Sequence, residues 1–182
     1  MKVRLQLMTS VAENVFHPPF YLRHSTVQTV LASMGLRKTG SNPMLLAAQQ
    51  HVLDAGDGIR LSGFYSPVKN RTSKGLCILL HGWEGSSDST YVLSCGRYLY
   101  KYGYDVFRLN YRDHGRSHHL NQGLFYATLL EEVYQAVLKA ACLAENVPVF
   151  RVGFSLGGTY ALRLARRGVD NGRRPLRRVS YT

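Results

Sequence analysis

The stretch "VPVFRVGFSLGGTYALRLARR", Val147 to Arg167, is the most informative part of this sequence. An apolar run of strand-forming residues passes directly into a serine flanked by glycines, and a helical pattern follows without a spacer. Residues 153–157 fit G-x-S-x-G, in which a nucleophilic serine occupies a sharp turn between strand and helix. A chance match in a chain of this length has a probability of roughly 5 to 10 percent. The flanking strand and helix favour a nucleophile at Ser155 over the alternative, a plain tight turn.

Strand and helix signals alternate along the chain. Strands are expected at 58–65, 75–83, 104–111 and 147–154, with another beginning at 176–182, and helices are expected at 17–33, 84–103, 124–146 and 156–167. In the first helix, Val27, Val30, Leu31 and Met34 recur at helical spacing. This alternation predicts an α/β fold with a mostly parallel sheet covered by helices on both faces.

The helix expected at 124–146 is amphipathic. Its apolar face is expected to contain Tyr126, Leu129, Leu130, Val133, Ala136, Val137 and Ala140, and its polar face Glu131, Glu132, Gln135 and Lys139. Such a helix covers one face of a sheet.

The unusual residues follow three of the expected strands, at 81–83, 110–117 and 153–158. Chemistry in parallel α/β sheets is found at the carboxyl ends of the strands. Acyl transfer needs two backbone N–H groups that bind the developing oxyanion, and the candidates are those of Leu156 and Trp83. The alternative for 81–83 is a simple glycine turn. Neither glycine-rich turn has the spacing of a phosphate-binding loop.

Three blocks, "LLHGWEGSSDSTYV", "NYRDHGRSHHLNQGLFYATLLEEV" and "VGFSLGG", together with the early "HPPFYLRHSTVQT", carry a resemblance to a known family. The chain resembles the N-terminal two-thirds of an α/β-hydrolase of the YheT-like, embryogenesis-associated branch. The resemblance implies a serine esterase or lipase-like enzyme that hydrolyses carboxylic esters. It assigns the nucleophile to Ser155 and the oxyanion hole to the N–H groups of Trp83 and Leu156, with no metal or organic cofactor.

The resemblance does not supply the rest of a catalytic triad, whose order in this fold is Ser, then Asp or Glu, then His. After Ser155 the chain has one acid, Asp170, and no histidine. Asp170 is expected in a loop, and His81 is expected to shape the oxyanion turn. Structural or surface roles are expected for His114, His118 and His119, and a turn-forming role for Asp113.

We therefore expect one partial, C-terminally truncated α/β-hydrolase domain over 1–182, with a lead-in segment at 1–40 and core strands and helices at 55–182. Because the later Asp and His are absent, this chain alone is expected to be inactive or weakly active on small or lipid-like esters. The open sheet edge would favour self-association or aggregation.

The net charge of +12 is concentrated at the C-terminal end. From 151 onward one acid stands against eight arginines, at 151, 163, 166, 167, 173, 174, 177 and 178. A solvated helix end and loop is the favoured explanation. The alternative function is a non-catalytic basic protein that binds anionic partners, although no nucleic-acid module is recognisable.

Cys77, Cys95 and Cys142 show no metal-ligand spacing, and we expect small buried residues in a reducing compartment. No apolar run approaches the roughly 18 to 20 residues of a membrane-spanning helix. No signal-peptide core is evident either. The expected location is cytoplasmic.

Overall fold

The computed structural model describes residues 17–33, 41–170 and 179–181. The chain divides into two compact units, 1–36 and 37–182. Within the first unit, the short 3-10 helix η1 (Phe20–Leu22) precedes α1 (Ser25–Ser33). A helix is therefore present but begins later than expected, and Met34 lies outside the described residues. The apolar side chains of Val27, Val30 and Leu31 are exposed.

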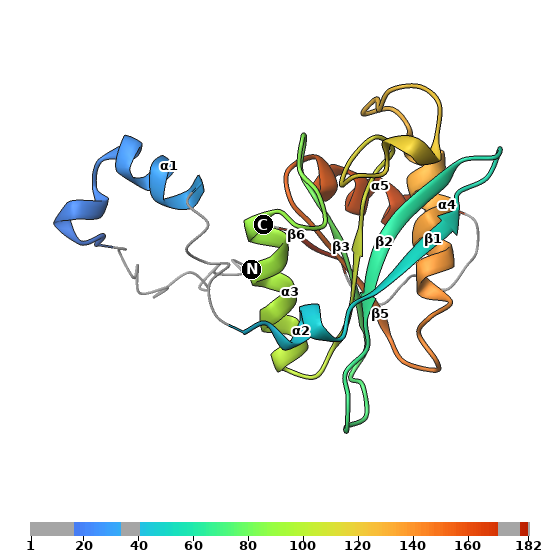
Figure 1. The fold of residues 1–182 in the computed structure, drawn as a ribbon, viewed down its shortest axis with the longest axis horizontal. Coiled ribbons are helices and arrows are strands. Elements are labelled where there is room, and N and C mark those ends of the chain that lie inside the picture. Colours follow the sequence, from blue (N-terminus) through green and yellow to red (C-terminus); the bar gives the residue numbers. More distant parts are fainter. Residues whose placement is uncertain (1–16, 34–40, 171–178, 182) are drawn as a thin grey trace, which may run out of the picture. The chain divides into compact units, whose positions relative to one another are not determined.

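The described part of the second unit contains one six-stranded sheet with the order β1-β2-β4-β3-β5-β6 (Figure 1). The strands are β1 (Gln49–Asp54), β2 (Arg60–Ser66), β3 (Leu76–Leu80), β4 (Asp105–Leu109), β5 (Val149–Gly153) and β6 (Val179–Tyr181). The last four are parallel to one another, whereas β1 and β2 are antiparallel at one edge. The predicted α/β fold with a mostly parallel sheet is confirmed.

Helices cover both faces of the sheet, as α3 and α4 on its two sides in Figure 1 show. The helices are α2 (Pro43–Leu46), α3 (Thr90–Lys101), α4 (Leu130–Ala141) and α5 (Leu156–Asp170). Successive residues of a strand point to opposite faces. In β3, Ile78 and Leu80 pack with α4 and α5, whereas Cys77 and Leu79 pack with α2 and α3. The continuous apolar run of β3 is therefore buried on both sides.

The amphipathic helix expected at 124–146 is α4, and it is shorter than predicted. It begins at Leu130, so Leu129 is its N-cap and Tyr126 lies before it with an exposed side chain. Glu132, expected on the solvent face, is buried because Arg112 binds its carboxylate through Nε at 3.1 Å and through Nη2. The helix pattern gave no sign of this ion pair, because its cation comes from another part of the chain.

Two further sequence expectations are corrected. Asp170 is the last residue of α5 and does not lie in a loop. Cys142 is exposed, and its thiol donates to the carbonyl of Leu138. Cys77 is buried and Cys95 half-buried, and all three thiols are free. None of the described helices is long and apolar enough to cross a membrane.

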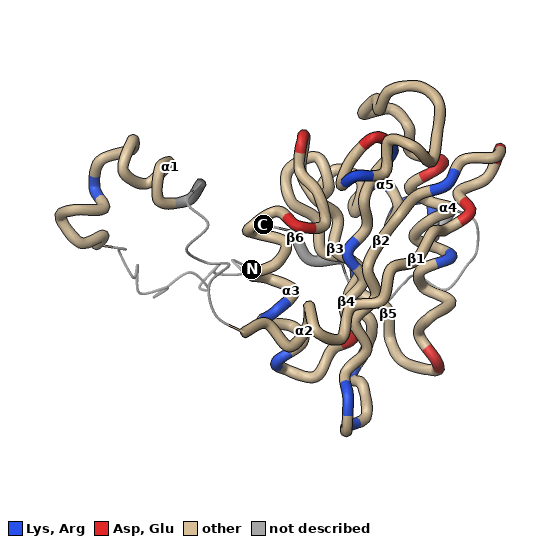
Figure 2. Tube along the Cα trace, in the orientation of Figure 1, with Lys and Arg blue, Asp and Glu red and all other residues tan. Residues whose placement is uncertain are grey.

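The basic C-terminal end is not uniformly solvated. Arg151 is buried in β5, and Arg167 pairs with Glu131 and lies over the ring of Tyr134 at 4.4 Å. Figure 2 shows the described Lys and Arg distributed among several elements. Arg163 and Arg166 are exposed. The other four arginines of this end, Arg173, Arg174, Arg177 and Arg178, lie outside the described residues.

The two-sided burial of β3 generates a stability prediction. Leu79 is fully buried, so Leu79→Ala removes packed methyl groups and leaves a cavity, which costs about 2 to 5 kcal/mol of unfolding free energy. Leu162, on α5, is 48% exposed, and Leu162→Ala costs less than about 0.5 kcal/mol. Urea unfolding followed by circular dichroism measures both. Equal losses would contradict the described packing.

Candidate active site

Ser155 occupies the turn between β5 and α5. β5 ends at Gly153 and α5 begins at Leu156, so two residues reverse the chain direction. Ser155 has φ +52°, a left-handed conformation that is uncommon outside glycine, and its side chain is exposed. Residues are held in such conformations only where the surrounding structure enforces them. This is the backbone geometry that a nucleophilic serine at this place requires.

The glycines on either side enforce the turn by close backbone contact. A Cβ atom at Gly153 would clash with the carbonyl of Gly157, and a Cβ at Gly157 would clash with the carbonyl oxygen of Leu80 at the end of β3. The N–H of Phe154 donates to the same Leu80 carbonyl at 3.0 Å. The start of α5 is therefore fixed directly against the end of β3.

The turn after β3 lies beside Ser155. A Cβ built on Gly82 would lie 3.3 Å from the carbonyl oxygen of Phe154 and 3.4 Å from the Cβ of Ser155. No described residue accepts a hydrogen bond from the backbone N–H of Trp83 or from that of Leu156. The two neighbouring turns thus bring two unused donors to the same end of the sheet as Ser155. Their role as oxyanion donors stays a prediction.

His81 holds the turn after β3 in place. Its Nδ1 donates to the carbonyl of Gly82 at 2.7 Å, and its Nε2 accepts from the N–H of Tyr111 at 3.3 Å. The hydroxyl of Tyr111 returns to the His81 carbonyl at 2.9 Å. Burial lowers the pKa of His81 to about 4. With both ring nitrogens engaged and the ring neutral, His81 shapes the turn and is not placed to act as a base.

Two residues near the end of β4 fix the other end of this turn. Sequence reasoning placed Asn110 at this sheet edge without a role and did not single out Arg108. Asn110 Oδ1 accepts from the N–H of Ser87 at 2.7 Å, and its Nδ2 donates to Ser62 Oγ at 3.2 Å. The buried Arg108 donates through Nη1 to the carbonyl of Ser87 at 2.7 Å and to Asp88 Oδ1 at 2.9 Å. The available signal was an arginine among the apolar residues of "VFRL", 106–109, because a buried cation needs a set of acceptors.

The loop after β4 contains the remaining histidines near this end of the sheet. His114 Nδ1 donates to the carbonyl of Arg112 at 2.7 Å. His118 is exposed and pairs with Asp113, whose φ of +61° agrees with the turn-forming role expected for it. His119 is exposed. Among the described residues, no histidine or carboxylate is hydrogen-bonded to the hydroxyl of Ser155.

The described residues contain no group of three or more His, Cys, Asp or Glu side chains placed to hold a metal ion. The described arrangement has an exposed serine beside the turn after β3.

The contact of Gly157 with Leu80 predicts a large effect of one added methyl group. In Gly157→Ala the added Cβ meets the carbonyl of Leu80, which cannot move without separating α5 from β3. We therefore expect the free energy of unfolding to fall by about 3 kcal/mol or more. Gly82→Ala, whose Cβ meets its nearest atom at 3.3 Å, serves as the control and costs about 1 kcal/mol or less. Chemical denaturation of both variants measures the difference. Equal losses of unfolding free energy in the two variants would show that the contact of Gly157 with Leu80 does not fix α5 against β3.

The buried, neutral His81 predicts a specific pH dependence of stability. Its pKa is about 4 in the folded chain, against about 6.5 in the unfolded chain. Above pH 6.5 both states are neutral there, and between about pH 6.5 and 4 only the unfolded chain takes up the proton. The free energy of unfolding therefore falls as the pH falls through this range. The loss is on the order of 3 kcal/mol and has fully occurred below about pH 4.

Denaturation between pH 4 and 8 compares wild type with His81→Gln, which lacks this contribution. The exposed His119→Gln is the control and should keep the wild-type slope. If His81→Gln retained the full wild-type slope, the buried ring would not be the neutral group described.

Comparison with known proteins agrees with this architecture. The family model of the alpha/beta hydrolase fold matches residues 76–173. A curated protein of Synechocystis sp., named "putative esterase", is 29% identical over 154 residues, which cover 81% of this chain and 41% of the relative. The chain therefore spans less than half the length of that relative.

Two solved structures are similar in fold. An α/β serine hydrolase without lid from Xanthomonas campestris has a TM-score of 0.57 at 19% identity, covering 66% of this chain and 56% of that one. Est1E from Butyrivibrio proteoclasticus, solved with ferulic acid bound, has a TM-score of 0.56 at 25% identity, covering 66% of this chain and 48% of its own. With the family model matching more than half of its residues, the chain belongs to the α/β-hydrolase fold family.

Proposed function

We propose that this chain supplies the nucleophile and the oxyanion-binding groups of a carboxylic ester hydrolase. Ser155 Oγ attacks the acyl carbon and its proton passes to a base, while the carbonyl π electrons move onto the oxygen. That oxygen accepts hydrogen bonds from the N–H groups of Trp83 and Leu156. Collapse of the adduct expels the alcohol, which takes up the proton, and leaves an acyl group on Ser155. Water then attacks this ester, releasing the acid and restoring the hydroxyl.

One observation carries the proposal. Ser155 is exposed and held at φ +52° between β5 and α5, in contact range of a turn that offers an unused N–H. A plain tight turn at this place would be built without strain, by a glycine at the left-handed position. Removing one oxyanion donor in a serine hydrolase costs about 2.7 to 4 kcal/mol of transition-state stabilisation, so two such donors are a substantial part of catalysis.

The comparisons support the reaction class. The Synechocystis protein is named as an esterase, and Est1E binds an aromatic acid. From Est1E we carry over only that a site on this fold accepts an aromatic ring. The assignment to the YheT-like branch belongs to the same proposal and rests on the sequence blocks around Trp83, Asp113 and Ser155.

A base for Ser155 is the missing element. All seven histidines precede Ser155 in the sequence, His81 is engaged at both nitrogens, and no described histidine touches the hydroxyl. We therefore propose that these 182 residues, taken alone, are inactive or nearly so. Any activity would rest on binding and the oxyanion donors, which in serine proteases leave roughly 10³ to 10⁴-fold over water.

Labelling with a fluorophosphonate tests the proposal without requiring turnover. In the wild-type chain the probe should react slowly at Ser155, because no described base activates the hydroxyl, and the label should disappear in Ser155→Ala. Thr159→Ala is the matched control, because Thr159 is an exposed hydroxyl one turn further along α5 and should not affect labelling. Mass spectrometry of the labelled peptide locates the adduct. Labelling of Ser155→Ala at the wild-type rate would refute the nucleophile.

Added imidazole tests whether a base is what these residues lack. Free imidazole can accept the Ser155 proton, so it should accelerate labelling of wild type and leave Ser155→Ala unlabelled. The rate should rise with the concentration of neutral imidazole. A wild-type rate that is already fast and insensitive to imidazole would show that a residue of this chain serves as the base.

A further inference from the structure

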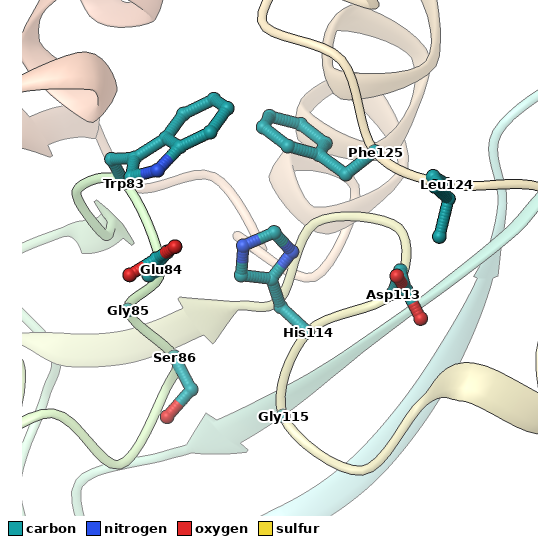
Figure 3. A pocket seen from close by; sticks show the side chains of 9 residues that line it. All are labelled: Trp83, Glu84, Gly85, Ser86, Asp113, His114, Gly115, Leu124 and Phe125. Carbon is teal, nitrogen blue, oxygen red and sulfur yellow. The ribbon is translucent and has the colours of Figure 1, made fainter.

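A cavity of about 590 Å³ opens beside the turn after β3. Its walls come from two segments far apart in sequence, the turn at 83–86 and the loop after β4 with its continuation to Phe125 (Figure 3). The volume falls within the range of small-molecule pockets, about 300 to 1,000 Å³. Because Trp83 lines the cavity and also carries one of the proposed oxyanion donors, a ligand held here lies next to the proposed site.

Aromatic rings form the most prominent wall. Trp83 is 59% exposed, and its ring centroid lies 5.9 Å from that of Phe125. Phe125 is stacked on the fully buried Tyr111 at 5.4 Å with an interplanar angle of 12°, so its position is fixed from behind. The ring of His114 meets Phe125 edge-on at 4.9 Å. This wall suits a flat ring.

His114 adds one directed polar group. A carbonyl oxygen can only accept, so the 2.7 Å contact with Arg112 O requires the hydrogen on Nδ1. The neutral ring then has its lone pair on Nε2, and no described residue donates to it. Figure 3 shows the ring turned toward Trp83 and Phe125. The cavity therefore contains an unused hydrogen-bond acceptor among aromatic rings.

The charges at the cavity select against anions. Glu84 and Asp113 line it, and no lysine or arginine is among its lining residues. Asp113 is paired with His118, whereas Glu84 is exposed. A ligand carboxylate would meet carboxylates and a lone pair without a compensating cation.

We propose that this cavity binds a neutral aromatic ring bearing a hydroxyl group, as part of the ester substrate, with the ring against Trp83 and Phe125 and the hydroxyl donating to His114 Nε2. The inference rests on the proposed function only in calling the ligand a substrate. The binding itself does not depend on Ser155.

Trp83 is the only tryptophan of the chain, so its fluorescence reports on this cavity directly. Para-hydroxyacetophenone and acetophenone are suitable probes, because their ketone stands in for an ester carbonyl and cannot be hydrolysed. Wild type should bind the hydroxylated ketone about three- to tenfold more tightly, the value of one net hydrogen bond. Para-hydroxybenzoate, which carries the same hydroxyl on an anion, should bind more weakly than para-hydroxyacetophenone.

His114→Phe keeps an aromatic ring and removes the acceptor, so the preference for the hydroxyl should vanish while acetophenone still binds. His119→Phe, at an exposed position outside the cavity, is the control and should keep the preference. Phe125→Ala should weaken binding of both ketones. Circular dichroism establishes that each variant is folded, and calorimetric titration repeats the affinities without relying on fluorescence.

Equal affinity of wild type for the two ketones, an unchanged preference in His114→Phe, or tighter binding of para-hydroxybenzoate would each overturn the inference. Ser155→Ala should bind the ketones as wild type does. Fluorophosphonate labelling at Ser155 without any ketone binding would leave the proposed function in place and reject the cavity. Ketone binding without labelling, even with added imidazole, would reject the proposed function and leave the cavity in place.

Discussion

The contact between the backbone of Gly157 and the carbonyl of Leu80 is the constraint on which the rest of the site depends. It presses the first turn of α5 against the end of β3, leaving no room for a side chain at 157. The chain must then turn within Phe154 and Ser155, and Ser155 takes the left-handed conformation. The same contact brings the turn after β3 beside the serine. This one contact therefore accounts for the strained backbone of Ser155, for the exposure of its side chain and for its position beside the turn after β3.

Polar side chains bind the turn after β3 at both of its ends. His81 and Tyr111 bind one end of the turn, and Arg108 and Asn110 bind the other end at Ser87. These four side chains are buried, where hydrogen bonds are electrostatically stronger than in water. Donors that are fixed before the reaction need no reorganisation when charge develops on the substrate. The network thus links fold stability to the proposed chemistry.

The sequence predicts those elements and residues whose signal lies within a short stretch of chain. The apolar run at β3 is a strong signal because burial on both faces leaves few residue types possible. The serine between Gly153 and Gly157 is a strong signal because close backbone contact excludes side chains at both glycines. β1 went unrecognised because only Leu53 in it is buried, which leaves no alternation to detect. The burial of Glu132 depends on Arg112, twenty residues away, so no helix pattern contains it. The free nitrogen of His114 likewise depends on a carbonyl whose position only the folded loop defines.

The central claim is that Ser155 and the N–H groups of Trp83 and Leu156 form one site. A crystal structure of the fluorophosphonate adduct at Ser155 tests it most directly, because the phosphonyl oxygen occupies the place of the oxyanion. The account predicts that this oxygen lies about 2.7 to 3.1 Å from both backbone nitrogens. An adduct whose oxygen points into solvent, with neither nitrogen in hydrogen-bonding range, would contradict it.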